Sequence, residues 1–366
     1  MVAEVYFTDM RARQGLNMLD KLERLFDAAG LEEIISPGDL VALKVHFGER
    51  GNTGYVRPQF VRRIVDKVKA RGGKPFLTDA NTLYVGSRAN AVDHIQTAIE
   101  NGFDFAVVGA PIVIADGLTG KDYRHVEING KHFREVKIGT AVLDADALIA
   151  ITHFKGHEMT GFGGTLKNLG MGLGSRSGKQ QMHSDVKPQV DPEKCIGCEK
   201  CQEWCPGAAI YTEGGKSVIA KDKCIGCGEC TVTCPVRAIA IRWETKPDVI
   251  QEKIVEYTMG VLKGKEGKAG FITFLTNVTP DCDCCSWSDA PVVADIGILA
   301  SKDPVALDQA CVDLVFKARG NPASALGRDD VEDKFRALHP DIDWRVQLEY
   351  GEKMGLGTRE YRLIKL

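Results

Sequence analysis

The chain has 366 residues, of which 44% are hydrophobic and 27% are charged, and its formal net charge is −3. This composition is that of a globular protein with room for one large α/β domain and a small insert, or for two to three domains. The weak charge gives no electrostatic basis for binding nucleic acid or a membrane surface, so neither is an expected partner.

The cellular compartment is inferred from the N-terminus, the apolar runs and the cysteines. The first residues, MVAEVYFTDMR, lack a basic segment followed by an apolar one, so we expect no secretory signal. The longest apolar run, 105–115, is too short for a membrane span and is interrupted by glycine and proline. Twelve cysteines without an export signal indicate a reducing environment. We therefore expect a cytoplasmic protein.

Strands and helices alternate through the first half of the chain. Continuous apolar runs predict buried strands, and Pro58 and the Gly72–Gly73 pair mark the start and the end of one helix. The predicted strands are 39–47, 74–81 and 146–151, the predicted helices are 58–70 and 89–102, and Asn129–Gly130 predicts a β-hairpin turn.

Polar side chains stand where two of these strands end. Lys44 and His46 close the first strand, beside Glu49, and Asp79 and Asn81 close the second. In a parallel sheet the carboxyl ends of strands share one edge, where open α/β folds bind ligands. The alternative is structural, with Asp79 as a turn residue and His46 as a satisfied interior histidine.

Residues 153–183, HFKGHEMTGFGGTLKNLGMGLGSRSGKQQMH, follow the strand 146–151 and hold seven glycines between Gly161 and Gly178. We expect a glycine-rich, basic loop that binds an anion such as phosphate or carboxylate. Its tail matches neither a Walker A loop nor a G-x-G-x-x-G fingerprint. The alternative is a loop that only packs against the cysteine-rich segment following it. The candidate catalytic residues are Lys155, His157, Lys167 and His183, which would orient an anionic substrate and supply protons.

Two stretches, KCIGCEKCQEWCPGAAI (194–210) and KCIGCGECTVTCPVRAI (223–239), repeat one motif, C-x2-C-x2-C-x3-C-P. Bacterial ferredoxins hold [4Fe–4S] clusters with this spacing, and the fourth cysteine of each motif ligates the other cluster. The sequence therefore predicts two [4Fe–4S] clusters. The first would be held by Cys195, Cys198, Cys201 and Cys234, and the second by Cys224, Cys227, Cys230 and Cys205. The alternatives are structural zinc, which usually shows two separated CxxC pairs, and disulfides, which do not suit a reducing compartment.

Prolines bound the cysteine-rich segment and suggest how the chain divides. Pro188 and Pro192 precede the motifs and Pro247 follows them. We expect an α/β domain formed by 1–185 and 245–366, interrupted by a ferredoxin-like α+β insert at 186–244. A module of this size needs its clusters as a core, since few apolar residues remain.

The second half of the chain continues the alternation. Residues 247–264 predict a helix, 269–278 and 294–301 predict strands, and Asp303–Pro304 begins another helix with an aspartate N-cap. Strand–helix alternation on both sides of the insert predicts an α/β fold with a mostly parallel sheet.

A third cysteine group, DCDCCSWSD (281–289), holds Cys282, Cys284 and Cys285. The predicted clusters are fully ligated without these thiols. They could bind a further metal, act as a redox dithiol, or lie in a loop without chemistry. Cys311 falls within an apolar helical pattern and is expected in the core.

These motifs resemble a known family. The chain is similar to iron–sulfur-center proteins that combine domain of unknown function 362 with an inserted two-cluster ferredoxin segment. The matching residues are VALKVHFGE (41–49), FKGHEMTGFGGTLKNLGMG (154–172), the stretch 281–310 and both cysteine motifs. The resemblance implies an architecture and a cofactor, and no reaction. A fainter similarity, at His157, Gly163–Gly164 and Lys167, is to the nickel-pincer lactate racemases, which do not use ferredoxin clusters.

The leading hypothesis is a ferredoxin-type oxidoreductase that passes electrons through two clusters to or from an anionic substrate or partner on the α/β domain. The second is a non-enzymatic electron carrier or adaptor, whose α/β domain docks a redox partner protein. A third is a redox sensor that uses Cys282, Cys284 or Cys285.

Overall fold

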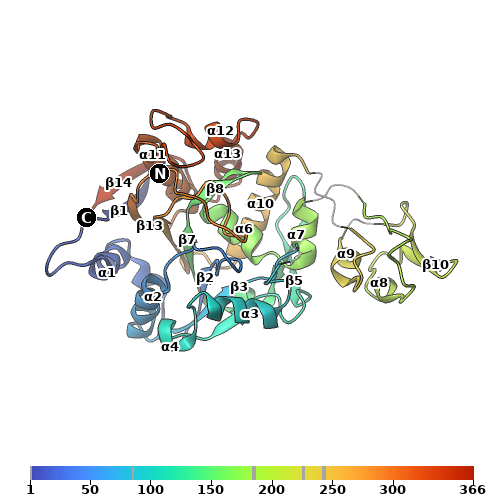
Figure 1. Cartoon of the computed structure of the whole chain (residues 1–366). Coiled ribbons are helices and arrows are strands. Elements are labelled where there is room, and N and C mark those ends of the chain that lie inside the picture. Colours follow the sequence, from blue (N-terminus) through green and yellow to red (C-terminus); the bar gives the residue numbers. More distant parts are fainter. Residues whose placement is uncertain (1, 85, 184–186, 225–226, 241–244) are drawn as a thin grey trace.

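An eight-stranded sheet organises the molecule (Figure 1). The computed structural model describes residues 2–84, 86–183, 187–224, 227–240 and 245–366. The strand order is β14 (Tyr361–Lys365), β1 (Ala3–Asp9), β13 (Gly297–Ser301), β12 (Ala269–Leu275), β7 (Ala147–His153), β2 (Leu40–Val45), β3 (Lys74–Asp79) and β4 (Ile112–Ile114). Within this sheet, β13 alone runs antiparallel to both of its neighbours. The predicted α/β fold with a mostly parallel sheet is confirmed.

Helices cover both faces of the sheet, and each face has its own core. Alternate side chains of β7 enter different cores, with Ile149 and Ile151 on one side and Leu148 and Ala150 on the other. The first core packs against α1 (Met18–Ala28), η1 (Leu31–Ile34), α2 (Pro58–Ala70), α3 (Ala91–Glu100) and α4 (Phe105–Val108). The second packs against α5 (Thr140–Asp144), α6 (Thr165–Leu173), α10 (Pro247–Leu262), α11 (Pro304–Lys317), α12 (Lys334–Leu338) and α13 (Arg345–Lys353).

The order of the parallel strands reverses between β2 and β7. From β2 the chain moves outward to β3 and β4, then returns to the other side of β2 as β7 and continues outward to β12. The segments that leave the carboxyl ends of β2 and β7 therefore diverge, which opens a crevice between them. This reversal determines where a ligand can reach the sheet edge.

The stretch 153–183 is not the glycine-rich loop that the sequence predicts. It forms a short hairpin, β8 (Lys155–His157) with β9 (Gly161–Gly163), then α6 and α7 (Arg176–His183). The glycines permit close packing rather than loop conformations. A Cβ on Gly170 would lie 2.1 Å from the Ile254 carbonyl oxygen of α10, and one on Gly172 would lie 2.5 Å from the Lys44 side chain.

The cysteine-rich segment projects from one side of the sheet domain (Figure 1). It holds α8 (Lys200–Glu203), a hairpin of β10 (Ile210–Glu213) with β11 (Lys216–Ile219), and α9 (Glu229–Thr233). Its apolar core among the described residues is small: Cys201, Ile210, Cys230 and Ile239 are buried there. The expected boundaries of the insert, at 185/186 and 244/245, fall on residues 184–186 and 241–244, which lie outside the described residues.

Most of the other predicted elements begin and end within a few residues of their predicted bounds. The Asn129–Gly130 turn joins β5 (Tyr123–Glu127) to β6 (Glu135–Gly139), with Asn129 at φ 51°. Asp303 caps α11 by accepting from the N–H groups of Val305 and Ala306, and Cys311 is fully buried in that helix. No helix in the described part of the chain is both long and apolar enough to span a bilayer.

Candidate functional site

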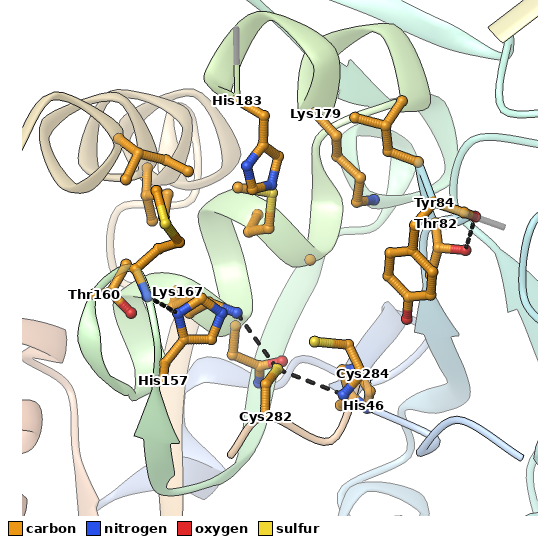
Figure 2. Close-up of a pocket in the computed structure, with 18 of the residues that line it drawn as sticks. His46, Thr82, Tyr84, His157, Thr160, Lys167, Lys179, His183, Cys282 and Cys284 are labelled. Atoms are coloured by element: carbon orange, nitrogen blue, oxygen red, sulfur yellow. Dashed lines mark hydrogen bonds between the residues drawn. The ribbon is translucent and has the colours of Figure 1, made fainter. Parts of the chain in front are cut away.

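A pocket of about 310 Å³ lies at the reversal of strand order, beyond the carboxyl ends of β2, β3 and β7 (Figure 2). Figure 2 shows Lys179 and His183 entering from α7 on one side, across from His157, Cys282 and Cys284. The polar residues that line the pocket are His46, Asp79, Thr82, Tyr84, Arg88, Lys155, His157, Glu158, Thr160, Lys167, Asn168, Lys179, His183, Cys282 and Cys284.

Buried ion pairs form one wall of the pocket. The Lys44 ammonium donates to Asn168 Oδ1 at 2.8 Å and lies 3.1 Å from Asp79 Oδ1. Arg88 lies 3.5 Å from the same carboxylate and 3.3 Å from Glu49. Although burial alone would raise it, the pKa of Asp79 is lowered by Lys44 and its other cationic neighbours. Asp79 is thus an ionised partner of buried cations, and its charge is already compensated before any ligand binds.

Asp283 links the strand β7 to the cysteine loop. Both of its oxygens lie 2.9 Å from His153 Nδ1, and Oδ2 lies 3.1 Å from Lys155 Nζ. The other ring nitrogen of His153 contacts the Thr276 and Asn277 carbonyl oxygens at 3.0 Å. Since carboxylate and carbonyl oxygens only accept, both ring nitrogens donate and His153 is an imidazolium. The pKa of Asp283 falls well below its ordinary value, because His153 and Lys155 outweigh the effect of burial.

Cys282 to Cys285 form a tight turn above this ion pair, in which the Cys285 N–H donates to the Cys282 carbonyl at 3.0 Å. Within the turn, the Asp283 carboxylate is held by its ion pairs, while Cys282 and Cys284 on either side of it line the pocket. Cys285, in the same turn, does not line it. Cys284 and burial raise the pKa of the Cys282 thiol to about 12. Cys282 lowers the pKa of Cys284, but Cys285 and burial outweigh that effect and raise it to about 11.

Two lysines give the pocket its positive character. Lys167 Nζ lies 3.7 Å from Cys282 Sγ, and Lys179 Nζ donates to the Gly174 carbonyl at 2.8 Å. Neither forms an ion pair with a carboxylate of the described residues. Burial lowers the pKa of Lys179 to about 8. Burial also acts to lower the pKa of Lys167, but Cys282 and Cys284 raise it above its ordinary value.

The pocket histidines are neutral near neutral pH. Burial and the charge of Lys167 lower the pKa of His157 to about 4 and that of His183 to about 3. The Met159 N–H donates to His157 Nδ1 at 3.0 Å, and the Gly48 N–H donates to His46 Nδ1 at the same distance. With Nδ1 accepting, the remaining ring proton of His157 and of His46 sits on Nε2. Both of these rings therefore offer a donor, as do the two lysines.

The four cysteines expected to hold the first cluster lie around one hollow of the cysteine-rich segment. Cys195, Cys198, Cys201 and Cys234 line one small hollow, together with Ile196 and Val236. Among the described residues, backbone N–H groups donate to sulfurs of both motifs: Ser217 N–H to Cys195 at 3.4 Å, Ala209 N–H to Cys205 and Ala238 N–H to Cys234, both at 3.2 Å. Hydrogen bonds of this kind tune metal–thiolate centres.

The helix α7 touches both the pocket and the cysteine-rich segment. The Thr231 hydroxyl of α9 donates to Gln180 Oε1 of α7 at 3.3 Å. Beside this contact, Glu229 accepts from Lys137 at 2.9 Å and from the Tyr123 hydroxyl at 2.6 Å. Lys137 also donates to the Cys227 carbonyl at 3.1 Å. The loop carrying the second motif is thereby held against the helix that supplies Lys179 and His183.

The structure brings Lys155, His157, Lys167 and His183 together in one pocket, as their expected roles require. His46 and Asp79 join them, whereas Asn81 does not line the pocket and instead donates to Asp116. Sequence reasoning treated Cys282 and Cys284 as a separate site. It counted Lys179 only among the basic residues of the anion-binding stretch, and it gave no role to Arg88. The spacing of Lys179 and His183, four residues apart, signals one helical face once α7 is recognised as a helix.

Comparisons with known proteins give a family and a set of distant structural likenesses. The lactate racemase apoprotein from Thermoanaerobacterium thermosaccharolyticum is similar with a TM-score of 0.39 and 12% identity, over 74% of this chain and 50% of that one. A protein from Thermotoga maritima, solved in a structural genomics programme, gives a TM-score of 0.37 and 12% identity, over 72% of this chain and 52% of that one. This chain thus spans about half the length of each.

No curated protein sequence matches the chain. The domain of unknown function DUF362 matches residues 41–313, a range that contains the pocket residues, the cysteine-rich segment and the turn of Cys282 to Cys285. This match covers well over half of the 366 residues. The chain therefore belongs to the DUF362 family.

Proposed function

We propose that this chain is a cytoplasmic iron–sulfur oxidoreductase that binds a small anionic substrate in the pocket. Cys195, Cys198, Cys201 and Cys234 would hold one [4Fe–4S] cluster, and Cys224, Cys227, Cys230 and Cys205 the other. When bound, the clusters would supply one-electron transfer. The chain would divide into a ferredoxin-like insert, 186–244, within an α/β domain formed by 1–185 and 245–366.

The donor set fits these cofactors. One hollow is lined by three cysteines of the first motif and the fourth cysteine of the second. This is the crossed grouping by which two-cluster ferredoxins bind iron. Backbone N–H groups already point at the sulfurs of Cys195, Cys205 and Cys234. The apolar core of the segment is too small to order it alone, which favours a cofactor as its main stabilising element.

The observation that carries the enzyme proposal is the double contact of α7. One side of this helix packs on α9 through Gln180, and its Lys179 and His183 line the pocket. Electrons at the second motif would thus be one helix away from a bound substrate. A separate carrier domain would not require such a shared element.

Within the pocket, the chain's own residues would bind and protonate the substrate. Lys167 and Lys179 would pair with a carboxylate or phosphate, since neither is neutralised by a carboxylate of the described residues. The pKa of Lys179, lowered by burial to about 8, places its proton in the range useful for general acid catalysis at neutral pH. His157 would donate a hydrogen bond from Nε2, because Nδ1 accepts from Met159.

The second candidate function, an electron carrier that docks a redox partner, is favoured by one observation. Ile196 and Val236 line the hollow of the first cysteine group and are 63% and 38% exposed. Exposed apolar side chains beside metal ligands suit a protein surface that docks transiently. The two candidates are compatible if the partner docks at this hollow and the substrate binds in the pocket.

Anaerobic purification and reconstitution tests the proposal. We expect about eight iron atoms and eight sulfides per chain, with a reducible signal in electron paramagnetic resonance. Reduced protein is then mixed with carboxylate and phosphate compounds that can accept electrons, and re-oxidation of the clusters is followed by absorbance. Lys167→Ala should abolish substrate-dependent re-oxidation while leaving the iron content unchanged. Re-oxidation by redox proteins alone, unaffected by Lys167→Ala, would favour the carrier, and absence of iron would end both candidates.

A further inference from the structure

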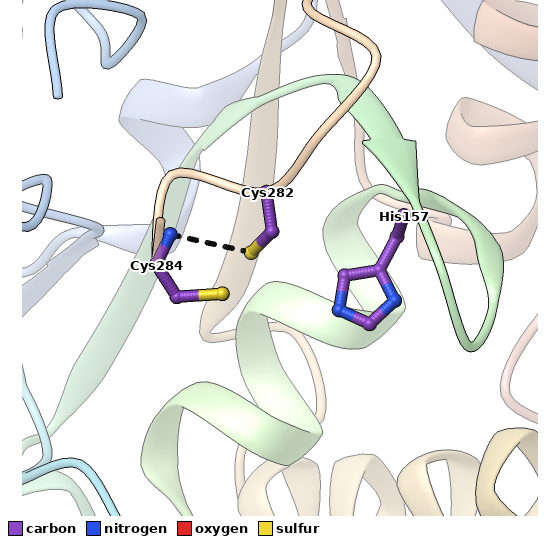
Figure 3. A group of neighbouring side chains, drawn as sticks. All are labelled: His157, Cys282 and Cys284. Carbon is purple, nitrogen blue, oxygen red and sulfur yellow. Dashed lines mark hydrogen bonds between the residues drawn. The ribbon is translucent and has the colours of Figure 1, made fainter. Parts of the chain in front are cut away.

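We propose that the pocket also binds a thiophilic divalent metal ion such as Zn²⁺ through Cys282, Cys284 and His157. The ligand atoms of these residues lie within 4.8 Å of one another, and Figure 3 shows the three side chains converging. This site is separate from the eight cysteines of the repeated motifs. The proposal therefore does not depend on the proposed iron–sulfur clusters.

The chemistry of the donor set favours a soft metal. The set combines two thiolates with one imidazole, and thiolate ligands select zinc and similar thiophilic ions over magnesium or calcium. Structural zinc sites normally use four protein ligands, whereas catalytic sites use three and keep the fourth position open. Among the described residues, the group contains three such donors and no fourth.

Contacts within the metal-free chain already hold the three donor residues in place. Cys282 and Cys284 flank Asp283, whose carboxylate is fixed by His153 and Lys155. The turn is closed by the hydrogen bond from the Cys285 N–H to the Cys282 carbonyl. His157 ends β8, a strand of the hairpin that leaves the sheet after β7. Buried ion pairs thus orient the ligands in the way that outer-shell groups do in metal sites.

The fourth position would face the pocket. All three ligands line it, and Lys167 Nζ lies 3.7 Å from Cys282 Sγ. A divalent ion neutralises two thiolates, and the ammonium of Lys167 beside Cys282 adds a positive charge at the site. A carboxylate or phosphate oxygen is the kind of ligand that this charge and a Lewis-acidic ion attract together.

Metal binding by His157 has a structural consequence. In the metal-free chain Nδ1 accepts from the Met159 N–H at 3.0 Å, which leaves Nε2 as the nitrogen available to the sulfurs. An imidazole that ligates through Nε2 carries its proton on Nδ1. A protonated Nδ1 cannot accept a hydrogen bond from another N–H group. The Met159 N–H must therefore leave Nδ1 when the metal binds, and His157 Nε2 then holds the metal instead of donating a hydrogen bond to the substrate.

Zinc analysis of the full chain tests the site. Anaerobic protein carrying its iron–sulfur clusters is incubated with Zn²⁺ and desalted, and zinc and iron are counted per chain. We expect about one zinc per chain, with two sulfurs at about 2.3 Å and one nitrogen at about 2.0 Å in zinc-edge X-ray absorption. Cys282→Ser, Cys284→Ser and His157→Gln should each weaken zinc binding by at least about tenfold. Cys285→Ser, in the same turn and outside the group, is the matched control and should bind zinc normally.

The zinc site is overturned if the zinc content is unchanged in Cys282→Ser and Cys284→Ser, or if the absorption edge shows four sulfurs, which marks zinc at the repeated motifs. Zinc that survives His157→Gln, with Met159 still protected from hydrogen exchange, overturns His157 as a ligand and the three-donor site with it. Iron content reports separately on the clusters, so loss of iron without loss of zinc counts against the proposed function only.

Discussion

Asp283 is the residue on which the pocket most depends. It is buried, and its carboxylate compensates both the His153 imidazolium and the Lys155 ammonium. It also fixes the turn that presents Cys282 and Cys284. Removing one member of a buried ion pair costs far more than the net contribution of the pair, because the remaining charge stays buried and unpaired.

We therefore expect Asp283→Asn to destabilise the protein by about 3–5 kcal/mol in chemical denaturation. Asp289→Asn, which removes an exposed carboxylate from the same loop, is the control and should change the free energy of unfolding very little. An Asp283→Asn chain as stable as the control would show that His153 and Lys155 are not both charged.

Lys179 gives anion binding a predictable pH dependence. Burial lowers its pKa to about 8, so the ammonium is present below that pH and lost above it. We expect the affinity of the pocket for an anion such as inorganic phosphate to fall by up to about tenfold per pH unit above about pH 8, measured by calorimetry. Lys179→Arg keeps its charge and should remove this dependence. A wild-type profile that stays flat to about pH 9.5 would contradict a role for Lys179 in binding.

His94 makes stability depend on pH in acid solution. It is fully buried, and burial lowers its pKa to about 3 despite the nearby Asp79. Its folded pKa lies below the unfolded value of about 6.5, so the unfolded chain binds the proton first. Its stabilising contribution is present above about pH 6.5 and declines as the pH falls toward the folded pKa, by up to about 1.4 kcal/mol per pH unit.

Denaturation of wild type and His94→Gln at several values from about pH 7 down to about pH 5 measures this contribution. The slope of the free energy of unfolding against pH should be shallower in His94→Gln. Equal slopes in the two proteins would mean that His94 does not remain neutral in the folded chain.

At the scale of elements, the contact between α7 and α9 is a close one. Gly228 has φ +75°, and a Cβ there would lie 2.3 Å from the Gln180 side chain of α7. Gly215, on the hairpin of β10 and β11, has φ +73°, and a Cβ there would have nothing within 4 Å. The two glycines thus differ in packing and hardly at all in backbone conformation.

Gly228→Ala and Gly215→Ala should separate these effects. Both variants incur the left-handed cost of about 1–2 kcal/mol, and Gly228→Ala should additionally push α9 away from α7. Hydrogen exchange of α7 should rise in Gly228→Ala and stay near wild type in Gly215→Ala, at equal iron content. Identical exchange in the two variants would argue against a tight contact.

The elements show what the sequence can and cannot predict. Buried parallel strands such as β2 and β7 have continuous apolar runs, so their positions were predicted. The helices α6 and α7 were missed, because their glycines oppose helix formation locally while permitting close packing on α10 and Lys44. The strands β1 and β14 were missed as well, since each pairs with a segment far away in the chain.

The same reasoning applies to the site. That Cys282 lies beside His157 depends on the pairing of β12 with β7, in which Phe274 is opposite His153, so that the segments following both strands leave the sheet together. A single sequence does not report which strands pair. The cysteine motifs needed no such information, because each motif carries its own local spacing.

For the whole molecule, we predict that the iron and the sheet are separable. The sheet domain has two extensive cores, whereas the core cluster of the cysteine-rich segment, within its described residues, contains four buried side chains, two of them cysteines. Removal of iron with a chelator should therefore unfold about 60 residues and leave the remainder folded. Hydrogen exchange would show loss of protection in α8, β10, β11 and α9 but not in β2, β7 or α10. Loss of protection throughout the sheet would mean that the clusters support the whole chain.

The pairing of β1 with β14 has a consequence for biosynthesis. Glu4 and Arg362 form an ion pair across 358 residues of sequence, and β13, the other neighbour of β1, also comes late in the chain. At translation rates of about 5–20 residues per second, β1 waits on the order of 20–70 s for its partners. During that time β1, a strand with two open edges, leaves the ribosome unpaired, so nascent chains of this protein should be clients of chaperones that bind this strand early.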